Sequence, residues 1–323
     1  MIKISNNVNT KFRPEGVYPA LPTPIADDNS INYEAAEKHI RYLEKEGVHG
    51  LVPAGCTGHA ASLGDEGGDD LFEEHVEFVR RISEMTDLPI IAGSGMNTTQ
   101  QAIDLARAVE NNADIDAHLS ISPYQNCPPQ DMIVEHYRQI AESVDKPIIA
   151  YNVPGRTGRN IKAETTKQLS EIDGLIGIKE ASLDHHQIYR IGKMLQISED
   201  NFELGSGDDA ANHFVFEQGG SFAISVSANV HPSGVVDVWR KGYKEGNHLE
   251  AYQRNQELMP IHEAMFQEGE KNPISVQYAL NCMGFNFGTP RGPLSRKPQQ
   301  NEQYQNREEI KKVLRQFDLL EKG

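Results

Sequence analysis

The 323-residue chain carries a net charge of −16 and an isoelectric point near 5.2. Nucleic acids and anionic membrane surfaces repel a protein this acidic, which argues against both as partners. The chain has no apolar run long enough to span a bilayer, and its first residues, MIKISNNVNTKFRPEG, lack the apolar core of a signal peptide. We therefore expect a cytoplasmic protein that acts on a small molecule.

Short apolar runs of β type alternate with longer segments of helical period from residue 16 onward. This alternation is typical of parallel βα units, and eight such strands close a barrel. The predicted strands are 17–22, 50–54, 89–93, 117–122, 147–152, 175–179, 202–205 and 222–226.

A doubly wound open sheet uses the same alternation, but it needs a glycine-rich dinucleotide fingerprint after an early strand. The first two connections read PTPIADDNS and PAGCTGHAASLG, and neither matches GxGxxG. The sequence therefore favours an α/β fold of the (β/α)8 TIM barrel type over residues 14–231. A short N-terminal arm (1–13) precedes the predicted barrel, and helices (232–323) follow it.

Small polar residues stand before the predicted helices. Ser30 and Asn32 precede a helical segment at 33–40, and Asn97 precedes another at 98–103. Such residues cap the first free N–H groups of a helix, so they support the predicted helix starts.

The three cysteines, Cys56, Cys127 and Cys282, lie far apart and show no spacing of a zinc site or a disulfide framework. His185 and His186 are adjacent and point in divergent directions from a helix. We expect reduced thiols and no metal site.

The apolar strand segment GLIGIK ends in Lys179, at a position where a turn residue is usual. Burial there lowers the pKa of a lysine, and the neutral amine can then attack a carbonyl. The alternative is an ordinary lysine whose aliphatic stem reaches water at the strand end. Tyr151 ends the neighbouring strand, about 5 Å away by sheet spacing, and a phenol can exchange protons with an amine. It can equally be a core tyrosine with a satisfied hydroxyl.

Two loops at the carboxyl ends of predicted strands offer groups for carboxylates. The turn from Gly55 to Gly58 presents backbone N–H groups and the Thr57 hydroxyl. Arg156 lies between Gly155 and Gly158, where it can pair with a second carboxylate or remain a solvated surface arginine.

These segments together resemble the dihydrodipicolinate synthase and N-acetylneuraminate lyase family over about residues 14 to 295. GIKEAS is similar to the family's Schiff-base motif and YNVPGRTG to its tyrosine motif, and GSGDD and AISVSAN follow in the same order. The resemblance implies a pyruvate-dependent class I lyase on a (β/α)8 barrel, with no cofactor beyond the covalent imine. It also implies a homo-oligomer, a dimer or a tetramer.

The resemblance assigns roles to particular residues. Lys179 would form the imine and Tyr151 would donate and accept protons. Thr57, with the backbone around Gly58, would bind the pyruvate carboxylate, and Arg156 the carboxylate of the second substrate. Gly207 and Ile224 would line the site.

Departures from the family pattern concern the second substrate. Cys56 stands where a hydroxyl residue links the tyrosine into a proton relay, and His59 replaces an acid. Gln125 replaces the relay tyrosine that crosses a dimer interface, whereas Tyr124 is retained. A thiol and an amide are poorer proton relays than hydroxyls. Gln101 stands where lysine-inhibited synthases carry glutamate, so we expect no feedback by lysine.

Three outcomes follow for function. The first is condensation or cleavage between pyruvate and an aldehyde, as in a dihydrodipicolinate synthase, or with a 2-keto-3-deoxy sugar acid as the cleaved substrate. The second keeps the imine but dehydrates a 2-keto-3-deoxy acid. The third is a non-catalytic protein that binds a keto acid, because two members of the relay are changed.

Overall fold

The computed structural model describes residues 12–64, 72–196, 201–267, 270, 272–294 and 305–321. Most of the predicted N-terminal arm, residues 1–11, lies outside the described residues. The proposed domain boundaries at 14 and 231 stay predictions.

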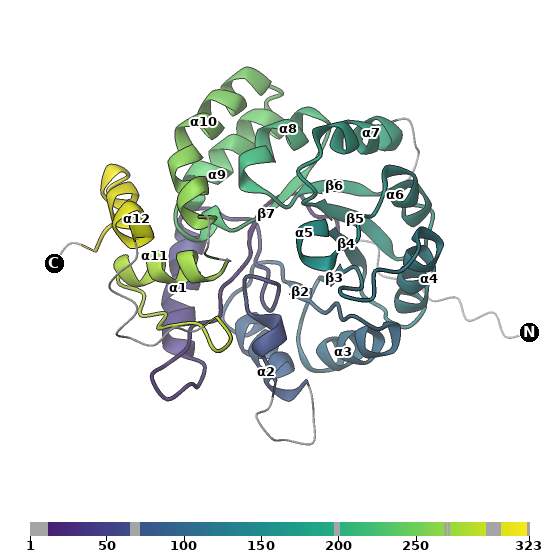
Figure 1. Ribbon diagram of the computed structural model, residues 1–323, viewed down its shortest axis with the longest axis horizontal. Coiled ribbons are helices and arrows are strands. Elements are labelled where there is room, and N and C mark those ends of the chain that lie inside the picture. Colours follow the sequence, from purple (N-terminus) through teal and green to yellow (C-terminus); the bar gives the residue numbers. More distant parts are fainter. Residues whose placement is uncertain are drawn as a thin grey trace, which may run out of the picture.

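Parallel strands form the centre of the molecule, and helices surround them (Figure 1). The sheet has the order β1-β7-β6-β5-β4-β3-β2, and all its pairs are parallel. Its strands are β1 Gly16–Pro19, β2 Ile91–Gly93, β3 Ala117–Ile121, β4 Ile148–Asn152, β5 Leu175–Glu180, β6 Glu203–Ser206 and β7 Phe222–Ser225.

The predicted strand at 50–54 is reduced to bridges, but it still closes the ring between β1 and β2. The Val52 N–H donates to the Pro19 carbonyl at 2.9 Å, and the Leu51 N–H donates to the Pro89 carbonyl at 2.9 Å. The curled parallel sheet therefore closes as the (β/α)8 prediction requires, although this strand is shorter than expected.

The helices lie around and beside the barrel. They are α1 Tyr33–Lys45, α2 Glu73–Ser83, α3 Thr99–Asn112, α4 Gln130–Ala141, α5 Pro154–Thr157, α6 Ala163–Leu169, α7 His185–Gln196, α8 Asn212–Glu217, α9 Pro232–Trp239, α10 His248–Met265, α11 Ile274–Cys282 and α12 Gln305–Gln316. Four short helices complete the order: η1 Ala60–Ser62, η2 Asp209–Ala211, η3 Ser227–Asn229 and the π-helical η4 Arg240–Lys244. The last three α-helices gather on the side of α1 and α9 (Figure 1).

Helix starts follow the small polar residues of the sequence, with one shift. The Asn32 side chain caps α1 by accepting from the Ala35 N–H at 3.1 Å, as expected. At α3, Thr98 is the cap and accepts from Gln101, so the helix starts one residue after the predicted position and Asn97 lies outside it. A threonine hydroxyl serves this role as an asparagine amide does.

Two kinds of apolar cluster stabilise the barrel. Inside it, side chains from β1, β2, β3, β4, β5, β7 and the short second strand meet, among them Val52, Leu119 and Phe222. Outside it, strand residues pack against the helices, and the C-terminal helices add Leu258 and Leu280 to the cluster around β1 and β7. The C-terminal helices are thus attached to the barrel by a shared apolar core. None of the helices in the described ranges is long and apolar enough to cross a bilayer.

Gly93 should be essential for the closure of the barrel at the short second strand. A Cβ atom there would lie 2.1 Å from the Ala54 carbonyl oxygen, whereas a Cβ on Gly155 would meet nothing within 4 Å. We expect Gly93→Ala to lower the free energy of unfolding by at least about 2 kcal/mol. Gly155→Ala should change the free energy of unfolding by no more than about 0.5 kcal/mol, or raise it slightly. Chemical denaturation measures both, and equal stabilities would contradict the proposed crowding.

Candidate active site

An irregularity in β5 turns Lys179 toward the barrel interior. Ile149 pairs with Gly177 and Tyr151 with Lys179, but the pairing shifts by one residue just before Ile149. Ile176 belongs to the inner cluster and Ile178 to the outer one, so strict alternation is broken between them. An extra residue in a strand reverses the side on which later side chains emerge. Without it, Lys179 would point outward into the helices.

The Lys179 amine lies in an almost dry environment. The residue is 5% exposed, and its Nζ atom is 4.2 Å from the centroid of the Tyr151 ring. Burial lowers the pKa of this lysine from 10.5 to about 8, although the neighbouring Cys56, Asp209 and Asp208 side chains oppose the shift. A substantial fraction of the amine is therefore neutral near physiological pH.

Tyr151 lies on β4 directly beside Lys179 and is 7% exposed. Burial raises the pKa of its hydroxyl well above the ordinary value, and the neighbouring Cys56 thiol raises it further. The positive charge of Arg156 acts in the opposite direction. The phenol thus keeps its proton and can lend it to a reacting oxygen.

Gly207 and Ile224 form walls beside the lysine. A Cβ atom on Gly207 would approach the Lys179 Cε atom to 2.9 Å, so a larger residue would push the side chain aside. The Gly207 N–H donates to the Glu180 carbonyl at 2.8 Å, and Ile224 lies on β7 within the inner cluster.

Two carboxyl groups after β6 also approach the site, although sequence reasoning gave them no role. Burial raises the pKa of Asp208 to about 6, with a further contribution from Asp209. The Asp209 carboxylate accepts the N–H groups of Val226 and Ser227 at 3.0 and 2.8 Å, and so braces the end of β7. Two consecutive acids after an apolar strand were the signal in the sequence.

The turn from Gly55 to Gly58 follows the short second strand, as expected. Thr57 is 3% exposed, and its Oγ1 atom accepts a hydrogen bond from Asn272 Nδ2 at 2.8 Å. In the described part of the chain, the backbone N–H groups of Thr57 and Gly58 donate to no protein group. The turn therefore offers donors for a carboxylate.

Arg156 lies on α5, over the ring of strands in Figure 1. Its side chain is exposed, and Nη2 donates to the main-chain carbonyl of Asn272 at 3.1 Å. Asn272 precedes α11 in the C-terminal helices. Asn272 belongs to none of the barrel motifs. The one signal for it in the sequence was its position just before the proline at the start of α11.

The residues that depart from the family pattern occupy different surroundings. Cys56 is half-buried and acts electrostatically on both Lys179 and Tyr151, and Tyr124 is close enough to be influenced by it. Gln125 is exposed, has a φ of 68°, and makes no hydrogen bond to Tyr151 among the described residues.

Three further residues take places outside this arrangement. His59 is buried with a φ of 57°, and burial lowers its pKa to about 4, so the imidazole is neutral. His185 begins α7 and contacts the Phe214 ring at 4.7 Å. Gln101 lies in the first turn of α3. Among the described residues, no three His, Cys, Asp or Glu side chains gather as metal ligands do.

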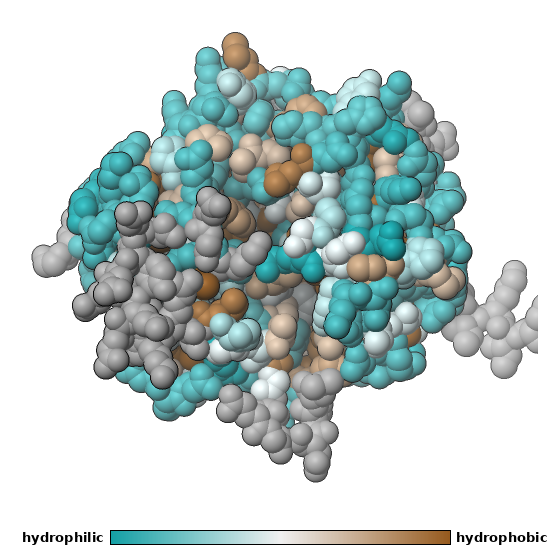
Figure 2. All heavy atoms as spheres, viewed as in Figure 1, coloured by the Kyte–Doolittle hydropathy of each residue, from teal (hydrophilic) through white to brown (hydrophobic). Residues whose placement is uncertain are grey.

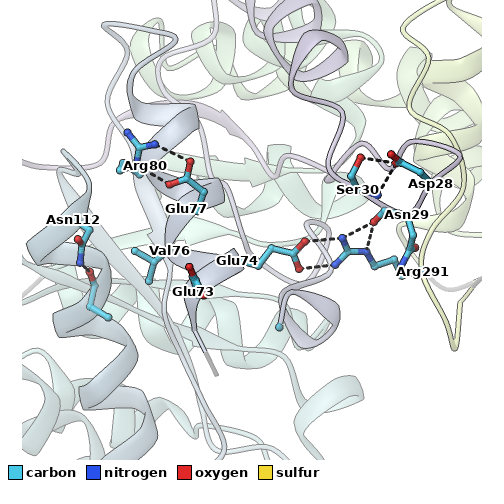
Figure 3. A pocket seen from close by; sticks show the side chains of 12 residues that line it. Asp28, Asn29, Ser30, Glu73, Glu74, Val76, Glu77, Arg80, Asn112 and Arg291 are labelled. Carbon is cyan, nitrogen blue, oxygen red and sulfur yellow. Dashed lines mark hydrogen bonds and ion pairs between the residues drawn. The ribbon is translucent and has the colours of Figure 1, made fainter. Parts of the chain in front are cut away.

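A separate cavity of about 770 Å³ lies between the 28–30 loop, α2 and α3 (Figure 3). Half of the residues that line it are charged, and both arginines among them pair with glutamates of the lining. Arg291 bonds to both Glu74 oxygens at 2.5 and 2.6 Å, and Arg80 bonds to Glu77 at 2.7 and 2.8 Å. This cavity contains none of the candidate catalytic residues, and we place no substrate there.

The barrel mouth combines the groups that an imine requires. Residues of intermediate and apolar hydropathy lie around the middle of this face, and hydrophilic side chains dominate its periphery (Figure 2). A partly neutral amine, a protonated phenol and donors for a carboxylate meet at the carboxyl ends of strands. Together they suit covalent chemistry on a keto acid.

Because burial disfavours the charged lysine, replacing it should stabilise the fold. The cost of the buried charge is fully present below the folded pKa of about 8 and disappears as the pH rises toward 10.5. We expect Lys179→Met to raise the free energy of unfolding by about 1–3 kcal/mol at pH 7 and by less at pH 10. The exposed Lys193 on α7 is the control, and Lys193→Met should change stability by under about 0.5 kcal/mol. Denaturant titrations at both pH values provide the measurement, and a loss of stability in Lys179→Met at pH 7 would refute the desolvation argument.

The chain matches a family model described as the dihydrodipicolinate synthetase family over residues 13–316. The 4-hydroxy-tetrahydrodipicolinate synthase of Archaeoglobus fulgidus is 39% identical over 306 residues, which cover 95% of this chain and 99% of the relative. The synthase of Natronomonas pharaonis is 40% identical over 302 residues, with 93% and 96% coverage.

Solved structures agree with this match. Dihydrodipicolinate synthase from Thermotoga maritima superposes with a TM-score of 0.87 at 32% identity, over 96% of this chain and 100% of that one. The chloride-inhibited synthase from Acinetobacter baumannii, solved with pyruvate, gives 0.85 at 31% identity, with 95% and 99% coverage. The chain therefore belongs to the dihydrodipicolinate synthetase family of class I aldolase-type lyases and shares its barrel over nearly the whole length.

Proposed function

We propose that this protein condenses pyruvate with an aldehyde through an imine on Lys179, and that aspartate semialdehyde is the aldehyde. The burial of Lys179 against the Tyr151 ring is the observation that carries the proposal, because burial lowers the pKa of the lysine to about 8. Full-length relatives named 4-hydroxy-tetrahydrodipicolinate synthase support the choice of aldehyde.

The reaction begins when the neutral Lys179 amine adds to the keto carbon of pyruvate. Tyr151 relays the two protons that the nitrogen loses to the former carbonyl oxygen, which leaves as water and gives the imine. Loss of a proton from the pyruvate methyl group gives an enamine, whose carbon attacks the aldehyde and forms the new carbon–carbon bond. The aldehyde oxygen takes up the proton that the methyl group lost, and hydrolysis of the imine by water restores the keto group and returns the free lysine.

Two positive or polar sites would hold the carboxylates. The Thr57 hydroxyl and the backbone N–H groups of Thr57 and Gly58 would bind the pyruvate carboxylate. The Arg156 guanidinium, exposed on α5, would bind the carboxylate of the aldehyde. Asp208 lies nearby and is partly protonated near its pKa of about 6.

A second candidate function is cleavage of a 2-keto-3-deoxy sugar acid to pyruvate and an aldehyde. It is favoured by the half-buried Cys56 thiol beside Tyr151 and by the exposed Gln125 side chain, which together replace two relay hydroxyls. Dehydration of such an acid, or binding without turnover, would keep the same imine site. Cytoplasmic location and a homo-oligomeric state stay predictions.

Borohydride reduction in the presence of pyruvate tests the imine. We expect mass spectrometry to find one reduced pyruvate adduct, peptide mapping to place it on Lys179, and the adduct to be absent from Lys179→Ala. The initial rate of adduct formation should rise with pH through about 8, because the neutral amine is the nucleophile. Lys193→Ala is the control and should react like the unmodified protein. An adduct at another lysine would refute the assignment.

A panel of substrates then separates the candidate functions. Consumption of pyruvate with aspartate semialdehyde supports the synthase, and release of pyruvate from a 2-keto-3-deoxy sugar acid supports the aldolase. Consumption of that acid without release of pyruvate indicates a dehydratase. An adduct without turnover of any compound indicates a keto-acid-binding protein.

The Cys56 thiol should matter for proton transfer rather than for binding. We expect Cys56→Ala to lower kcat about 10- to 100-fold with a small change in the KM for pyruvate. Cys56→Ser should retain or raise kcat, because a hydroxyl passes protons more readily than a thiol. The half-buried Cys282 on α11 is the control, and Cys282→Ala should keep kcat. Steady-state kinetics decide this, and an unchanged kcat in Cys56→Ala would remove the thiol from the proton path.

A further inference from the structure

Asn272 contacts the candidate active site from outside the barrel. It lies between α10 and α11, yet its Nδ2 atom donates to Thr57 Oγ1 at 2.8 Å, across 215 positions in the sequence. Asn272 is 5% exposed and Thr57 is 3% exposed. A hydrogen bond between two buried side chains fixes both of them, because neither can exchange its partner for water.

The direction of this hydrogen bond determines where the Thr57 proton points. A hydroxyl has one proton and two lone pairs, and the Asn272 N–H occupies one lone pair. The Thr57 hydroxyl donates to no protein acceptor in the described part of the chain. Its proton is therefore available to an acceptor that binds beside the Gly55 to Gly58 turn.

The same residue holds the second candidate carboxylate site through its backbone. Arg156 Nη2 donates to the Asn272 main-chain carbonyl at 3.1 Å. This carbonyl is independent of the side chain at position 272. Asn272 therefore connects Thr57 and Arg156 through two different groups.

We propose that Asn272 is a positioning residue for both substrate carboxylates. Its side-chain amide orients the Thr57 hydroxyl as a donor to the pyruvate carboxylate, and its main-chain carbonyl sets the place of Arg156. This inference rests on the proposed function and extends it, because it attributes the spacing of the two carboxylate sites to a residue of the C-terminal helices. The remaining amide oxygen, Asn272 Oδ1, is buried and has no partner among the described residues. An amide turned the other way would take the Thr57 proton for itself.

Two substitutions at Asn272 test the side-chain role. Asn272→Asp keeps the shape but replaces the donor with acceptors, so it should draw the Thr57 proton away and repel the pyruvate carboxylate. Asn272→Ala simply removes the donor. We expect the KM for pyruvate to rise about 10-fold in the alanine variant and about 100-fold or more in the aspartate variant. The KM for the aldehyde and kcat at saturating pyruvate should stay within about threefold, because the carbonyl that holds Arg156 remains.

A double-mutant cycle and a matched control complete the test. In a Thr57→Val background, Asn272→Ala should have no further effect on the KM for pyruvate. Asn281, which lies on α11 away from the site, is the control. Its side-chain amide donates a hydrogen bond to the Gly288 carbonyl at 2.7 Å. Asn281→Ala should lower stability and leave the KM for pyruvate unchanged.

The possible outcomes separate this inference from the proposed function. If the unmodified protein forms a pyruvate adduct but both Asn272 variants keep its KM for pyruvate, the positioning role is wrong. Equal rises in the KM for pyruvate and the KM for the aldehyde would indicate general damage and would also overturn the positioning role. Additive effects of the Thr57 and Asn272 substitutions in the double-mutant cycle would do the same. If the unmodified protein forms no adduct, the proposed function fails and this inference fails with it.

Discussion

The inward direction of Lys179 is the constraint on which the rest of the site depends. The extra residue in β5 puts Ile176 and Gly177 on the inner side in succession, so that Lys179 emerges beside Tyr151. An outward lysine would lie among the surrounding helices. An inward lysine loses its hydration, and its pKa falls to about 8. Burial costs stability and provides a neutral nucleophile, and the apolar clusters on both sides of the sheet compensate for this cost.

The groups around the lysine come from segments that are far apart in the chain. Asp209 binds two N–H groups at the end of β7, and Gly207 leaves room for the lysine side chain. Thr57 follows the short second strand, and Asn272 reaches it from the C-terminal helices. These helices share an apolar core with the barrel, so they can hold Asn272 at a fixed distance from the mouth. In this arrangement the helical extension contributes to substrate binding.

The changed relay residues affect a different step from imine formation. Lys179 and Tyr151 contact each other without help from Gln125, which is exposed. Cys56 remains next to Tyr151, so its thiol is the candidate group for proton exchange with the phenol. Imine formation and the choice of aldehyde are therefore separable in this protein. In the proposed function, the first would depend on burial in the barrel and the second on the loop that carries Arg156.

The sequence by itself determined the barrel and the order of its motifs, because alternating apolar runs are local signals. It also singled out Lys179 and Tyr151 as strand-end residues, whose proposed roles came from the family resemblance. It also indicated the Asn32 cap, although at α3 it pointed to Asn97 where Thr98 is the cap. Only the tertiary structure decided that Lys179 points inward, because the extra residue in β5 is visible in the pairing with β4 and in no local pattern. Only the fold revealed Asn272 as well, since its contact with Thr57 joins segments separated by 215 positions.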